Sequence, residues 1–164
     1  MIKNQHKKAF TLIELILFFG LFSIILGVLT NLFSVIVDTQ TEVETTSAVE
    51  NDSKFITTRI MYDIQRADSI SMPASVGSQT ATLSLIIDGE TYNYAVNNGN
   101  LELTINSNTD TLNGNLTQLS DISFQRFGNI GGKHAIRLQF TIDSRNETAA
   151  GQETKQIETM IGLR

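Results

Sequence analysis

The chain opens with a long apolar run that contains almost no charge. Residues 10–37 read FTLIELILFFGLFSIILGVLTNLFSVIV, in which Glu14 is the only ionisable side chain. About 20 apolar residues cross a bilayer as a helix, so this run is long enough to span a membrane. It exceeds the apolar part of a secretory signal peptide, and no A-x-A cleavage pattern follows it. We therefore predict a retained membrane helix.

The helical pattern continues beyond the apolar run as a single stripe. Apolar side chains recur at spacings of three, four or seven, at Val49, Ile56, Ile60, Ile64 and Ala67. This spacing predicts an amphipathic helix that reaches about Ser69 and ends before Pro73. Arg59, Asp63 and Arg66 lie on another face, where we expect solvent-exposed pairs at i,i+3 and i,i+4.

The rest of the chain alternates between apolar and polar residues, as β-strands do. The predicted strands cover residues 81–87, 91–96, 101–105, 121–127, 134–143 and 156–163. Asp88-Gly89 and Asn97-Asn98-Gly99 are turn signals between the first three, and residues 106–115 and 144–154 read as polar loops. The predicted fold class is α+β, with the second half of the helix packed on an antiparallel sheet.

Charge gives the predicted helix a direction across the membrane. Lys3, Lys7 and Lys8 precede the apolar run, and Asp38 and Glu42 follow it. The positive-inside rule then places residues 1–9 in the cytoplasm and the remainder outside the inner membrane. The whole chain carries a net charge of −5, which disfavours a direct nucleic-acid partner.

The N-terminal residues resemble a known family. KKAF-TLIEL is similar to the leader and first mature residues of type IV pilins and type II secretion pseudopilins. The resemblance implies that prepilin peptidase cuts between Ala9 and Phe10 and methylates the new amine of Phe10. It also implies that Glu14 pairs with the N-terminal amine of a neighbouring subunit during assembly. Ala9 stands where the family usually has glycine.

This resemblance divides the chain into four segments. Residues 1–9 are a cytoplasmic prepilin leader, 10–37 a transmembrane and filament-core helix, 38–72 its amphipathic continuation, and 73–164 an antiparallel β head domain. Major pilins often carry a proline in the apolar segment. This chain has Asn31 about there, which favours a minor pilin or pseudopilin.

A looser resemblance covers the C-terminal half. RIMYDIQRADSI, GNLEL, LSDISFQRF and ETMIGLR look like J/W-type minor pseudopilins, which implies a place in the initiating tip of a filament. The implied partners are other pilin or pseudopilin subunits, prepilin peptidase, the assembly platform protein and a motor ATPase. Whether the system serves secretion, pilus formation or DNA uptake stays open.

Small and polar side chains form a second pattern in the apolar helix. They recur at spacings of three or four, at Gly20, Ser23, Gly27, Asn31 and Ser34. Such a stripe suits close helix–helix packing in lipid, and ordinary glycine and serine usage in membrane helices is the alternative. Glu14 lies roughly on the opposite side of the helix.

The sequence offers little for catalysis. No phosphate-binding loop or nucleophile motif occurs, and His134 has no acid or nucleophile placed beside it, so we expect a surface residue. Asn106, Asn108 and Asp110 alternate like a calcium loop, but its glycine and closing glutamate are missing. We expect no enzyme, cofactor or metal.

The alternative function is a bitopic inner-membrane protein with an extracytoplasmic ligand-binding or sensor head.

Overall fold

The computed structural model describes residues 11–129, 132–148 and 151–164. The chain divides into two compact units, Met1–Gln40 and Thr41–Arg164, and we refer to the second as the head. Its strands are β1 (Ser69–Met72), β2 (Gln79–Thr80), β3 (Leu83–Ile87), β4 (Glu90–Asn97), β5 (Asn100–Ile105), β6 (Asn108–Thr111), β7 (Thr117–Gly128), β8 (His134–Thr148) and β9 (Gly151–Gly162).

The helix α1 runs from Leu12 to Arg66. No proline interrupts it, because Pro73 is the single proline of the chain. The predicted end near Ser69 was too late. Asp68 donates its backbone N–H to Ile86 at 2.8 Å, and Ser69 already pairs with β3. Sheet pairing therefore takes over from helical hydrogen bonds just after Arg66.

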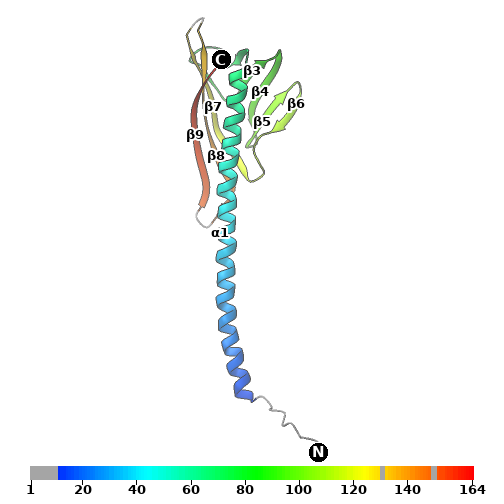
Figure 1. The fold of residues 1–164 in the computed structure, drawn as a ribbon, viewed down its shortest axis with the longest axis vertical. Coiled ribbons are helices and arrows are strands. Elements are labelled where there is room, and N and C mark those ends of the chain that lie inside the picture. The colour runs from blue at the N-terminus through cyan, green and yellow to red at the C-terminus, as the bar shows by residue number, and fades with distance from the viewer. Residues whose placement is uncertain (1–10, 130–131, 149–150) are drawn as a thin grey trace, which may run out of the picture. The chain divides into compact units, whose positions relative to one another are not determined.

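The strands form two antiparallel sheets. One has the order β1-β3-β4-β5-β6 and the other β2-β7-β8-β9. In Figure 1, β3 to β6 lie on one side of the helix and β7 to β9 on the other. The α+β class is confirmed, but the single predicted sheet is divided into two.

The hairpins of the first sheet follow from their turn residues. Asp88 and Gly89 have φ of 52° and 79°, and Asn98 and Gly99 have φ of 50° and 76°. Positive φ at both central residues is what a two-residue hairpin needs. A third turn of this kind, at Asn106 and Ser107, leads into β6 inside the predicted polar loop. The prediction of a loop over residues 106–115 was therefore wrong. The turn gave no clear signal in the sequence, because it lacks the glycine that such turns usually contain.

The second sheet has longer strands than the alternation predicted. Residues 144–148 belong to β8 and 151–154 to β9, so the predicted loop there was wrong. Ser144 is fully buried. Its hydroxyl donates to the Asn146 carbonyl at 2.8 Å and accepts from the Glu153 N–H at 3.1 Å. These hydrogen bonds provide partners for buried polar groups in a stretch whose lack of apolar alternation predicted a loop.

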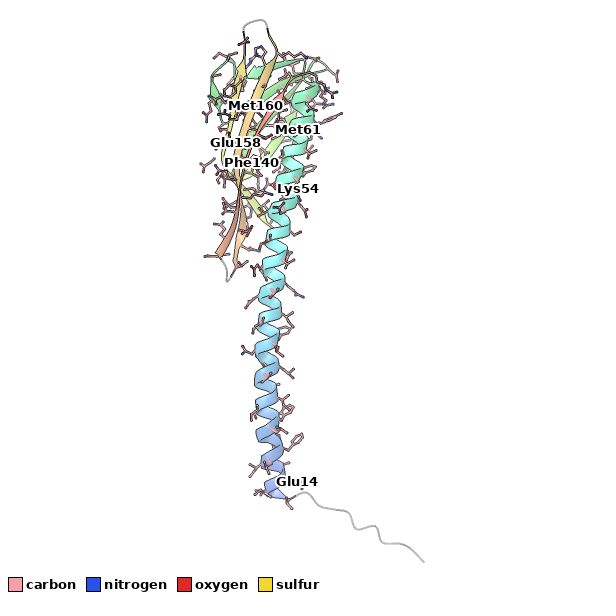
Figure 2. The ribbon with its side chains drawn as sticks, turned by 60° about the vertical axis from the view of Figure 1, so that its left-hand side comes forward. Glu14, Lys54, Met61, Phe140, Glu158 and Met160 are labelled. Carbon is pink, nitrogen blue, oxygen red and sulfur yellow. The ribbon has the colours of Figure 1, made fainter. Side chains whose placement is uncertain are left out.

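The core lies between α1 and both sheets. The predicted helix stripe is confirmed, since Val49, Ile56, Ile60, Ile64 and Ala67 are all buried. They share one cluster with Leu85 and Tyr94 of the first sheet and with Leu138 and Phe140 of the second. Figure 2 labels Phe140 on β8 and Met61 on α1, which packs against this cluster. Each fully buried isoleucine contributes about 1.5–3 kcal/mol.

The environment of Asp63 differs from the prediction more than that of any other residue discussed in the helix. The expected pairs with Arg59 and Arg66 form, at 2.9 and 3.1 Å between Nε and the carboxylate oxygens. However, Asp63 is fully buried, so the predicted solvent-exposed face was wrong at this position. The Tyr94 hydroxyl donates a short hydrogen bond to the same carboxylate. Burial, followed by the bond to Asp63, raises the pKa of Tyr94 well above its ordinary value.

Two acidic side chains tie α1 to the second sheet. Glu50 accepts from Lys155 of β9 at 2.6 Å and from Lys54 at 3.3 Å. The hydrogen bond from Lys155, then that from Lys54, lowers the pKa of Glu50. Asp52 accepts the backbone N–H of Gly114 at 2.8 Å and the hydroxyl of Thr117. Charged hydrogen bonds thus add to the apolar packing of the helix.

Candidate functional site

The helix α1 begins at a threonine cap. Thr11 Oγ1 accepts a 3.4 Å hydrogen bond from the N–H of Glu14, and the Thr11 carbonyl accepts from the Leu15 N–H at 3.2 Å. Thr-x-x-Glu is the pattern of a capping box, in which the fourth residue is glutamate or glutamine. This capping pattern was not predicted, although its residues are visible in the sequence.

Glu14 lies in the first turn of α1 (Figure 2). The positive end of the helix dipole favours a carboxylate there. No ion pair to Glu14 exists among the described residues. Capping and the dipole explain why the helix tolerates this residue. They leave its charge without a fixed partner inside the described chain.

The apolar segment after Glu14 has no cover within its unit. Every residue from 11 to 40 is exposed. The exposed bulky side chains include Leu15, Phe18, Phe22, Leu29 and Phe33. In the described part of the chain, α1 is the one helix long and apolar enough to cross a membrane, with a mean hydropathy of 2.7 in its best window. Removing such side chains from water, into lipid or against other helices, is favourable.

The small-residue stripe is open along its length. An added Cβ at Gly20 or Gly27 would meet nothing within 4 Å. The Ser23 hydroxyl donates to the carbonyl of Phe19 at 2.8 Å, so it is satisfied within the helix. Asn31 lines a shallow hollow with Val28, Leu32 and Val35. Ser34 lies on the same helix face and is exposed. The packing role of this stripe stays a prediction.

Ala9 and Phe10 lie outside the described residues. The cut between them, and the methylation of Phe10, therefore stay predictions from the sequence.

The remaining candidates do not assemble into a chemical site. Asn106 donates its side-chain amide to Glu90 at 2.7 Å, whereas Asn108 and Asp110 lie in strand β6. Within residues 11–129, 132–148 and 151–164, no three His, Asp or Glu side chains could jointly hold a metal ion. His134, expected at the surface, is partly buried at the start of β8.

Comparison with family models, with curated proteins and with solved structures gives no match for this chain. The architecture is described from the structure itself. It has a long apolar N-terminal helix, able in length to span a membrane, and a head in which a helix packs on antiparallel sheets. This is a pilin-like architecture.

Proposed function

We propose that the chain is a structural subunit, a minor pilin or pseudopilin, of a type IV pilus or type II secretion-like filament. Held in a bacterial inner membrane with its head outside, it assembles with other subunits through its N-terminal helix. The looser resemblance of its C-terminal half favours a place in the initiating tip. The observation that carries the proposal is the exposed apolar helix with one carboxylate in its first turn.

The proposed mechanism gives that carboxylate a partner made by processing. Cleavage after Ala9 leaves a free amine on Phe10, which prepilin peptidase methylates in a separate step. In an apolar environment an amine and a carboxylate attract each other far more strongly than in water. Glu14 of one subunit neutralises the amine of its neighbour, which lets both charged groups enter a filament core. Prepilin peptidase and the assembly platform are the partners that this mechanism requires.

A glutamine at position 14 separates the structural role from the proposed one. Glu14→Gln keeps the size of the side chain and remains a good capping-box residue, but it removes the charge. Leaving one member of a buried ion pair unpaired costs about 3–5 kcal/mol. We expect Glu14→Gln to lower recovery of the protein in sheared filaments about a hundredfold or more.

Two controls accompany this measurement. Glu44→Gln removes an exposed charge from the head and should leave recovery unchanged. Thr11→Val removes the cap and keeps the charge, at a cost of about 1 kcal/mol of helix stability, so it should reduce recovery about fivefold at most. If Glu14→Gln enters filaments as well as Glu44→Gln does, the mechanism is wrong. A bitopic sensor, the alternative function, requires no role for Glu14 at all.

A further inference from the structure

One exposed face of α1 within the head alternates aromatic and arginine side chains. Phe55, Arg59, Tyr62 and Arg66 follow one another at spacings of four, three and four, so they share a helix face. Phe55 is 53% exposed and Tyr62 is 58% exposed. We call these four residues the aromatic–arginine ridge. Tyrosine and arginine are among the side chains that contribute most at protein interfaces.

The two arginines of the ridge are held in place. Each donates its Nε–H to the buried carboxylate of Asp63, at 2.9 Å from Arg59 and 3.1 Å from Arg66. The Arg66 guanidinium also lies 4.9 Å from the ring centre of Tyr62 and 5.2 Å from that of Tyr92. An arginine has five N–H donors, so both retain donors for an external carboxylate. Side chains fixed in advance lose little entropy on binding.

A complementary surface lies on the same helix. Glu42, Val43, Thr46 and Ser47 line a shallow hollow, which we call the acidic hollow. Val43 is 63% exposed, and Glu42 is exposed beside it. On an ideal helix the hollow faces roughly 160° away from the ridge. The ridge offers cations around aromatic rings, and the hollow offers a carboxylate beside an apolar patch.

We infer that the aromatic–arginine ridge of one copy docks in the acidic hollow of a second copy of this chain, with Arg59 facing Glu42. The occupant follows from charge complementarity between two surfaces of the same molecule. Because the surfaces differ and face opposite ways, their contact is heterologous and adds copies in one direction instead of closing a dimer.

The inference rests on the proposed function, since anchoring in one membrane gives both copies the same orientation. Bringing residues 55–66 of one copy beside residues 42–47 of the next requires an axial offset of roughly 24 Å. The inference also deepens the proposed function, because it names the two surfaces through which neighbouring copies of this chain contact each other in the filament.

Cysteine cross-linking in the native host tests this contact. The chain contains no cysteine, so introduced thiols report only their own positions. Full-length Phe55→Cys and Val43→Cys, carrying different epitope tags, are co-expressed and treated with a short thiol-reactive cross-linker. Met160→Cys replaces Phe55→Cys as the matched control, since Met160 is 55% exposed on β9 (Figure 2).

We expect roughly ten times more 55–43 product than 160–43 product, because contact raises the local concentration of the two thiols. Adding Glu42→Arg to the Val43→Cys copy should lower the yield about fivefold or more by repulsion from Arg59. Asp110→Arg, the same charge change at an exposed site on β6, should not.

Three results would overturn the inference. If the protein enters filaments without giving the 55–43 product, the docking is wrong and the proposed function stands. If a 55–55 product dominates, the contact is symmetric and the docking is wrong. If the protein neither enters filaments nor gives the product, both the docking and the proposed function fail.

Discussion

Removing one hydroxyl from the head tests how the buried carboxylate of α1 is stabilised. The Tyr94 hydroxyl donates to Asp63, which is fully buried and also accepts from Arg59 and Arg66. A hydrogen bond to a charged group contributes about 1.5–3 kcal/mol to stability. Because both arginine contacts remain in Tyr94→Phe, we expect a loss of about 2 kcal/mol, within that range.

Hydrogen exchange of the full-length protein in detergent micelles measures this loss. Amides in the buried part of β8, around Leu138 and Phe140, should exchange only when the head opens globally. A loss of about 2 kcal/mol then speeds their exchange about 30-fold. Tyr62→Phe removes the same group from an exposed ring and should leave exchange close to that of the wild type.

A second variant raises the size of the effect. Asp63→Ala leaves the Tyr94 hydroxyl without its acceptor and two guanidiniums without their shared carboxylate. Breaking a buried ion pair in this way costs about 3–5 kcal/mol, so exchange should exceed that of Tyr94→Phe. Exchange in Tyr94→Phe as slow as in Tyr62→Phe would refute the reasoning, because the bond would then contribute nothing measurable.

Three further predictions concern other parts of α1. Ile60→Ala empties a fully buried site and should cost about 2–5 kcal/mol, seen as faster exchange throughout the head. The lowered pKa of Glu50 means that its contact with Lys155 stabilises the head above pH 4.5 and is lost as pH falls through the folded-state pKa. The exchange difference between wild type and Glu50→Gln should therefore be present at pH 7 and shrink on acidification. Gly27→Leu fills open space, so head exchange should stay unchanged while filament recovery falls.

Sequence periodicity predicted the apolar parts of the fold well, for a physical reason. The stripe through Ile56, Ile60 and Ile64 is buried as predicted, because apolar side chains on one helix face have no other way to leave water. Turns such as Asp88-Gly89 were found because few residues tolerate positive φ.

The polar parts of the fold were predicted poorly, because their burial depends on partners distant in sequence. Asp63 reads as a solvent-exposed charge, and only the folded chain brings Tyr94 to it. Ser144 likewise reads as part of a loop, yet it pairs with Thr117 of β7 and is fully buried. The Thr11 cap differs from these two cases. Its Thr-x-x-Glu pattern is local and visible in the sequence, so it could have been predicted.

In the candidate site, too, the apolar features were predicted and the arrangement of the polar ones was not. The apolarity of the helix, and the place of Glu14 in its first turn, follow from the sequence and agree with the structure. The aromatic–arginine ridge was not predicted. Its spacing is visible in the sequence, but nothing there shows that Phe55 and Tyr62 stay exposed or that Asp63 holds both arginines.

The mature N-terminus tests the central proposal most directly. Glu14 acquires its proposed partner only if the chain is cut between Ala9 and Phe10. Mass spectrometry of the protein purified from its native host should show a chain that begins at an N-methylated Phe10. A chain that still begins at Met1 in assembled filaments would contradict the proposal, because no amine could then stand at the start of the helix to neutralise Glu14.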